Sequence, residues 1–185
     1  MAAGATKGVD IRPAPERARL VDRVLAHAPW LLRLGLAMFA RLPAGSRLRR
    51  RALQEGLARV FAAVNRRDDP WYIAAGYEPD CEIHPAAGFR TLGMAACYRG
   101  HAGWREIIDD VREPLPDVRW VPEHVIDLGN RWVVRLGMWG SGRASGVRTN
   151  HTWGSVYHLS PRGRIARQDL YWTWDEALAA AGLRG

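Results

Sequence analysis

The last third of the chain carries four strand-like segments in succession, and this pattern constrains the fold more than any other feature. β-branched and aromatic residues dominate the segments, and short glycine-containing connections separate them. Such connections favour hairpins, so successive segments are predicted to pair antiparallel. The segments are Val118–Leu128, Trp132–Gly140, Val147–Leu159 and Arg164–Thr173. A sheet of this kind must bury one face against other elements.

Helical patterns fill most of the first half of the chain. The clearest is Arg47–Asn65, where apolar residues recur at helical spacing after Ser46, a favourable N-cap. Two short strands are predicted at Cys81–Pro85 and Ala95–Tyr98. The other predicted helices are Glu16–Ala28, Trp30–Leu42, Asp68–Gly76, Ala102–Val111 and Asp175–Ala181. Helices placed before an antiparallel sheet predict an α+β fold, with the helices gathered on one face of the sheet.

Charge divides the chain into two parts. Residues 1–51 carry 11 Lys and Arg against 3 Asp and Glu, whereas residues 52–185 carry 16 of each. The net charge of +8 therefore belongs to the N-terminal part. Nucleic acid is not predicted as a partner, because that would need a basic face on the folded domain. We predict a basic helical extension over residues 1–46, disordered over residues 1–15, and one domain over residues 47–185.

The apolar segment Ala28–Leu42 has two interpretations. It is too short to span a bilayer, and Arg33 interrupts it. We favour packing on the domain or on a partner subunit. Contact of residues 28–51 with a membrane surface is the alternative, because the basic run Arg47–Arg51 would suit anionic lipid. No secretory signal is visible, and lysine is nearly absent, so a cytoplasmic, bacterial protein is expected.

Two cysteines, Cys81 and Cys97, lie within the predicted short strands. They are predicted to be reduced thiols in the core of a cytoplasmic protein, and a disulfide between neighbouring strands is the open alternative. No cysteine or histidine spacing is typical of a metal site. We therefore predict no metal and no cofactor.

Short motifs follow one another in a consistent order between residues 47 and 182. They are Ala62-Ala-Val-Asn65, Tyr98-Arg-Gly-His-Ala-Gly103, Ile126-Asp-Leu-Gly-Asn-Arg-Trp-Val-Val134 and Arg162-Gly-Arg-Ile165. Their order and spacing resemble the nuclear transport factor 2-like superfamily, in particular its SnoaL-like branch, which has the polyketide cyclase and ketosteroid isomerase-like fold. The resemblance implies a curved sheet that forms a cone around helices, with a pocket inside. It also leaves the outer face of the sheet free for a second subunit, as in a homodimer.

The resemblance implies that one phase of the strand at residues 147–159 faces the pocket. Aromatic walls with a few polar groups suit a small apolar or aromatic ligand, and plain core packing is the alternative. The predicted pocket residues are Phe61, Tyr77, Tyr98, Trp104, His151, Trp153, Ser155, Tyr157 and Trp172.

Glu82 and His84 are the leading catalytic candidates. They lie two residues apart on a predicted strand, so they share a face. If that face is the pocket, His84 is the base and Glu82 or Asp169 supports it, because burial and a charged neighbour tune such a pair. If that face meets solvent, they are ordinary polar residues. A shift of one residue in the register of this strand decides between these interpretations. If the register is counted from Pro85, His84 faces the pocket, and if it is counted from Asp80, Ile83 faces the pocket and His84 faces away.

The enzyme classes of the superfamily each require their own residues. The positions that match the ketosteroid isomerase oxyanion hole read Val60 and Ser155, and the position of the cyclase acid reads Thr173. Arg167 and Asp169 supply only two of the three groups of a limonene-type epoxide hydrolase. The chain therefore lacks at least one of the catalytic residues that each of these enzyme classes requires.

The leading hypothesis is a SnoaL-like protein that binds a small hydrophobic molecule. Under this hypothesis it acts as a cofactor-independent acid/base enzyme of isomerase, cyclase, dehydratase or epoxide hydrolase type, with Tyr157 or Ser155 as hydrogen-bond donor. The alternative is a non-catalytic dimeric scaffold or ligand carrier, whose N-terminal helices contact a partner or a membrane surface.

Overall fold

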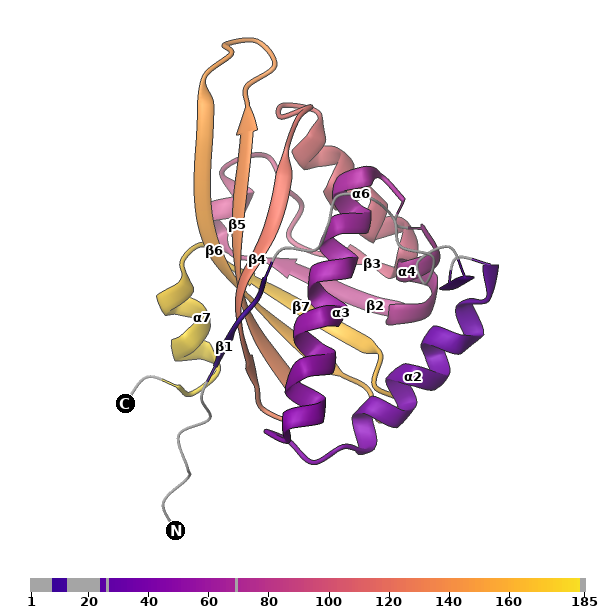
Figure 1. Ribbon diagram of the computed structural model, residues 1–185. Helices are drawn as coiled ribbons and strands as arrows, with labels where there is room; N and C mark the ends of the chain where they lie inside the picture. Colours follow the sequence, from indigo (N-terminus) through magenta and orange to yellow (C-terminus); the bar gives the residue numbers. More distant parts are fainter. Residues whose placement is uncertain (1–7, 13–23, 26, 69, 184–185) are drawn as a thin grey trace.

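The computed structural model describes residues 8–12, 24–25, 27–68 and 70–183 and has the predicted α+β fold (Figure 1). One curved sheet of seven strands runs in the order β1-β4-β5-β6-β7-β2-β3. Among the strands of the described residues, only the pair β2 and β7 is parallel, and the other neighbouring pairs are antiparallel. The strands are β1 (Val9–Asp10), β2 (Tyr77–Pro85), β3 (Tyr98–Arg99), β4 (Arg119–Asp127), β5 (Arg131–Ser141), β6 (Arg148–Leu159) and β7 (Ile165–Tyr171).

The helices agree closely with the sequence-based expectations. They are α2 (Pro29–Arg41), α3 (Arg47–Arg66), α4 (Pro70–Gly76), α5 (Ala87–Arg90), α6 (Gly100–Arg112) and α7 (Trp174–Ala180). Helix α3 begins at Ser46, whose hydroxyl accepts from the backbone N–H of Arg49 at 3.3 Å, as the N-cap prediction required. The predicted helix Glu16–Ala28 lies almost entirely outside the described residues.

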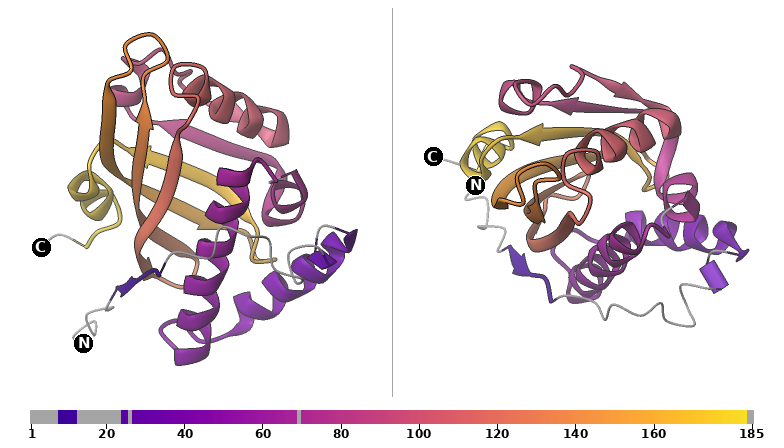
Figure 2. Two further views of the ribbon diagram at one scale, coloured as in Figure 1. Left: turned by 45° about the horizontal axis from the view of Figure 1, so that its top comes forward. Right: turned by 90° about the horizontal axis from the view of Figure 1, so that it is seen from above.

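Helices cover both faces of the sheet rather than one (Figure 2). Helix α3 crosses the concave face, and α7 packs against the opposite face. The alternation along β5 shows this division, because Val134 belongs to the main core and its neighbour Val133 packs with Ala177 of α7. Gly154 makes the close approach of α7 feasible, since a Cβ added there would lie 2.2 Å from the Cβ of Ala177.

Four local features differ from the predictions. Val9–Asp10 lies in the segment predicted to be disordered, yet it pairs with β4 and adds an edge strand. Strand β2 begins at Tyr77, four residues before the predicted start. Helix α5 follows β2 where no helix was expected, and the strand predicted at Ala95–Tyr98 instead begins at Tyr98 and ends at Arg99. The first two depend on partners that are distant in sequence, so local pattern carries no signal for them.

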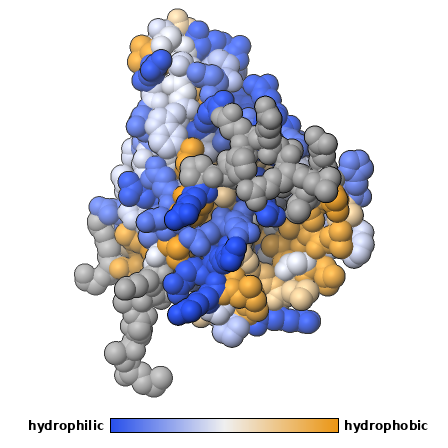
Figure 3. Space-filling view, in the orientation of Figure 1, coloured by the Kyte–Doolittle hydropathy of each residue, from blue (hydrophilic) through white to orange (hydrophobic). Residues whose placement is uncertain are grey.

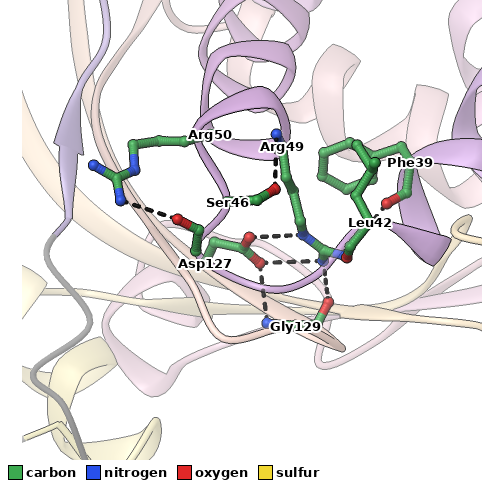
Figure 4. A network of polar contacts seen from close by, with 8 residues as sticks. Phe39, Leu42, Ser46, Arg49, Arg50, Asp127 and Gly129 are labelled. Atoms are coloured by element: carbon green, nitrogen blue, oxygen red, sulfur yellow. Dashed lines mark hydrogen bonds and ion pairs between the residues drawn. The ribbon is translucent and has the colours of Figure 1, made fainter.

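A buried ion pair joins the end of α2, the start of α3 and the turn between β4 and β5 (Figure 4). Arg49 is 2% exposed, and its Nε donates to Oδ2 of Asp127 at 2.7 Å. Its remaining N–H groups donate to Asp127 Oδ1 and to the carbonyl oxygens of Phe39, Leu42 and Gly129. Asp127 also accepts from the backbone N–H of Gly129 at 3.0 Å. The predicted extension is therefore attached to the sheet at its C-terminal end.

Within the described part of the chain, no helix is long and apolar enough to cross a membrane.

Candidate functional site

A cavity of about 630 Å³ lies between the concave face of the sheet and helices α3, α4 and α6. Apolar and aromatic side chains from all of these elements line it, among them Val64 of α3, Ile107 of α6 and Leu136 of β5. Seven of the nine predicted pocket residues belong to the lining, namely Phe61, Tyr77, Trp104, His151, Trp153, Tyr157 and Trp172. Cavities of this size and composition are typical of small-molecule sites.

The imidazole of His151 lies within an aromatic cluster at the cavity wall. Its ring centroid is 4.2 Å from that of Trp172 and 6.3 Å from that of Phe89, and it stacks on Trp153 at 6.2 Å. Burial lowers the pKa of His151 below the usual value of 6.5, and a hydrogen bond to the backbone of Trp172 opposes this effect. His151 is therefore neutral at pH 7. Its Nε2 is buried and has no hydrogen-bond partner among the described residues.

We expect His151 to make the fold less stable as the solution is acidified. A buried histidine with a lowered pKa takes up a proton less readily than the same residue in the unfolded chain. As the pH falls below about 6.5, the unfolded state therefore gains protons first, and stability declines until the folded-state pKa is reached. Denaturant unfolding at a series of pH values should show a smaller decline in His151→Phe than in the wild type. The control is His27→Gln, at an exposed histidine, and an equal decline in all three proteins would contradict the expectation.

A second polar group of the cavity comprises Tyr77, Gln168 and Ser155, here called the Gln168 network. The Tyr77 hydroxyl donates to Oε1 of Gln168 at 3.0 Å, and Nε2 of Gln168 donates to the Ser155 hydroxyl at 3.1 Å. Tyr77 and Gln168 belong to the lining, whereas Ser155 is completely buried behind it. One amide hydrogen of Gln168 and one lone pair of its oxygen remain for a ligand.

The tyrosine hydroxyls of the cavity act as hydrogen-bond donors at any ordinary pH. Burial raises the pKa of Tyr72, Tyr77 and Tyr157 well above the usual range, and the neighbouring tyrosines add to the effect at Tyr72 and Tyr77. Each phenol therefore keeps its proton. Such donors can hold a carbonyl or hydroxyl oxygen of a ligand.

Glu82 and His84 lie on the side of β2 that faces away from the cavity. Ile83 between them lines the cavity, and successive strand residues point to opposite faces. Tyr77 also lines the cavity, and it lies an even number of residues before Ile83, so alternation along β2 places both on the inner face. His84 Nε2 lies 2.8 Å from Glu82 Oε2, and Arg99 also contacts Glu82. Glu82 and His84 therefore contact each other, as an acid/base couple would, but neither residue lines the cavity.

Asp169 also belongs to the outer face of the sheet. Its neighbours Gln168 and Leu170 line the cavity, while Asp169 accepts from Arg167 Nε at 2.8 Å and lies 2.9 Å from Nε2 of His158. Asp169 and the Glu82–His84 pair therefore share a face but belong to separate ion-pair groups. The pairing of His84 with Asp169 across β2 and β7 places these groups next to each other.

Tyr98 is buried beside the cavity without lining it. Its hydroxyl donates to Asp110, which does line the cavity, and it accepts from the backbone N–H of Ala95 at 2.9 Å. Burial and the hydrogen bond to Asp110 raise the pKa of Tyr98 to about 12. Tyr98 therefore positions an acid at the cavity wall.

The residues best placed to hold a metal ion, among those described, are Glu82, His84 and Cys97. One ligand atom from each lies within 4.8 Å of the others. The guanidinium of Arg99 contacts Glu82, and this positive charge opposes a divalent cation. Cys81 and Cys97 are both free thiols, but only Cys81 belongs to the core as predicted, whereas Cys97 is partly buried and precedes β3. Burial raises the pKa of Cys81 to about 11, so its thiol stays protonated.

Comparison with known proteins agrees with this geometry. No curated protein matches the sequence. TerC, in a crystal structure with polyporic acid, shares 23% identity over 70% of this chain and 95% of its own, with a TM-score of 0.55. A nuclear transport factor 2-like protein from Burkholderia pseudomallei shares 21% identity over 68% of this chain and 93% of its own, with a TM-score of 0.56. The epoxide hydrolase/cyclase-like enzyme SalBIII shares 20% identity over 66% of this chain and 91% of its own, with a TM-score of 0.51.

These likenesses confirm the predicted nuclear transport factor 2-like fold. A family model gives the more specific result, because residues 57–168, more than half of the chain, match the SnoaL-like domain. The matched segment runs from α3 to β7 and so includes the helices and strands that enclose the cavity. The chain therefore belongs to the SnoaL-like domain family.

Proposed function

We propose that the protein binds a flat, mainly apolar small molecule in the cavity between the sheet and helices α3, α4 and α6. The cavity itself carries this proposal, since about 630 Å³ of space is lined mostly by apolar and aromatic side chains. The tyrosine hydroxyls and Gln168 supply a small number of polar contacts, which suit one carbonyl or hydroxyl oxygen on the ligand. Within the same fold, TerC was crystallised with a small molecule, polyporic acid, which supports a ligand-binding role.

For acid/base chemistry in this cavity, we propose His151 as the proton acceptor. A base must reach the bound molecule, and His151 lies in the lining whereas Glu82, His84 and Asp169 do not. Its lowered pKa keeps the imidazole neutral, which is the form that accepts a proton. A tyrosine hydroxyl would stabilise the negative charge that develops on the ligand oxygen. This assignment needs no metal and no organic cofactor.

The test of the binding proposal is a titration with the apolar fluorophore N-phenyl-1-naphthylamine, whose emission increases in apolar surroundings. We expect saturable binding to the wild type and at least about tenfold weaker binding to Met138→Glu, because a carboxylate in an apolar wall is costly. Met138 is half-buried and lines the cavity.

The matched control is Trp139→Glu, at the next residue of β5, which lies outside the lining. It introduces the same charge on the opposite face of the strand. Absence of saturable binding to the wild type would refute the proposal, and so would equal weakening by both substitutions.

A further inference from the structure

Helix α2 is apolar around most of its circumference. Only Arg33 and Arg41 are charged among its 13 residues, and none of its residues is buried. A helix with this composition is normally enclosed by protein or lipid, because an apolar surface in water is unfavourable. In the described structure one side of α2 is enclosed, and the other side is not.

The two sides of α2 differ in their surroundings. Leu32 and Phe39 pack against the main core, and the helix lies against α4. Trp30, Leu34 and Met38 follow one another at intervals of four residues, so they form one line along the helix. Their exposed fractions are 61%, 54% and 61%. We call these three residues the outer stripe, and Figure 3 shows apolar surface gathered over this helix.

The charged residues that lie in sequence from His27 to Gln54 are all positive. From His27 to Gln54 the sequence has six arginines and no aspartate or glutamate. Arg49 is buried against Asp127, whereas Arg33, Arg41 and Arg47 are exposed. Arg41 lies three residues after Met38 and therefore continues the line of the stripe. An apolar stripe with basic residues and a tryptophan is typical of a helix that lies in the interface of an anionic bilayer.

We propose that the outer stripe of α2 binds an anionic phospholipid surface, with the helix parallel to the membrane plane. The charges favour lipid over a second copy of the chain. A twofold interface through the stripe would bring Arg33 and Arg41 of both copies together, and like charges repel. A surface of phosphatidylglycerol instead supplies negative charge to every exposed arginine. This proposal is independent of the ligand in the cavity.

The test is sedimentation of the full chain with vesicles. We expect binding to vesicles of phosphatidylglycerol and phosphatidylcholine to be roughly thirtyfold to a hundredfold stronger than binding to phosphatidylcholine alone, since each basic residue near the surface contributes about 1 kcal/mol. Arg41→Gln should reduce this preference several-fold, and Leu34→Glu/Met38→Glu should abolish binding. Both residues of the double variant are more than half exposed, so the fold should be retained.

The matched control is Val147→Glu, which places a carboxylate at an apolar residue that is 66% exposed on the connection between β5 and β6. Its vesicle binding should equal that of the wild type. The alternative is that a second copy of the chain covers the outer stripe, and light scattering after gel filtration tests this by measuring the mass of the protein in solution. The proposal is overturned if the wild type does not bind the anionic vesicles, or if Val147→Glu loses binding as fully as the double variant. It is also overturned if the double variant splits a dimer while vesicle binding is unchanged.

Discussion

Replacing Asp127 by alanine is expected to lower the free energy of unfolding by about 3–5 kcal/mol. The substitution leaves the guanidinium of Arg49 without its counter-charge at a position that is 2% exposed. It also removes the acceptor of the Gly129 backbone N–H, which helps to shape the turn between β4 and β5. Chemical denaturation of the variant and the wild type measures the loss.

The matched control is Glu55→Ala, which also removes an acid from an arginine pair. Glu55 lies 2.9 Å from Arg51 and 3.7 Å from Arg59, and the Arg51 and Glu55 side chains are 80% and 51% exposed. Exposed pairs of this kind contribute about 0–1 kcal/mol. A loss for Asp127→Ala no greater than that for Glu55→Ala would show that the buried pair does not hold the elements together. Hydrogen exchange should also become faster in α2, because Arg49 binds the carbonyl oxygens of Phe39 and Leu42.

The sequence predicted the sheet well because its signals are local. Glycine-containing turns and alternating apolar residues locate β4, β5, β6 and β7 within two residues of every observed end. The Arg49–Asp127 pair was not predicted, because its members are 78 residues apart and no local pattern links them. Strand β1 escaped prediction for the same reason, since Val9–Asp10 is extended only through its pairing with β4.

Part of the candidate site could be predicted because alternate residues of one strand face the same side of the sheet. His151, Trp153 and Tyr157 share a phase of β6 and all line the cavity, as the resemblance implied. The facing of Glu82 and His84 stayed open at the sequence level, because the two possible registers of β2 differ by one residue, and the structure has the register with Ile83 inward. Gln168 was not among the predicted pocket residues, because its contacts with Tyr77 and Ser155 join residues that are distant in sequence.

Replacing Gln168 by leucine is expected to lower the free energy of unfolding by about 1–3 kcal/mol, because the buried Tyr77 hydroxyl is left without an acceptor, whereas Ser155 keeps its contact with Tyr157. The Tyr77 hydroxyl loses its acceptor, and the Ser155 hydroxyl loses its donor. The comparison is Tyr77→Phe, which keeps the contact between Gln168 and Ser155 but removes the Tyr77 hydroxyl from both Gln168 and Trp104, so it should cost at least as much. Denaturant unfolding of the three proteins distinguishes these values.

The same variant tests whether the Gln168 network binds the polar group of a ligand. Two probes of similar size, 2-naphthol and 2-methylnaphthalene, differ mainly in one hydroxyl, so the ratio of their affinities reports that hydroxyl alone. In the wild type this ratio should favour 2-naphthol, and Gln168→Leu should reduce the preference by about tenfold, the equivalent of one hydrogen bond of about 1.4 kcal/mol. The affinity for 2-methylnaphthalene should be preserved, because the apolar walls are unchanged. An unchanged ratio would mean that the network serves stability alone and that the ligand's polar group binds elsewhere in the cavity, where His151 is the remaining acceptor in the aromatic cluster.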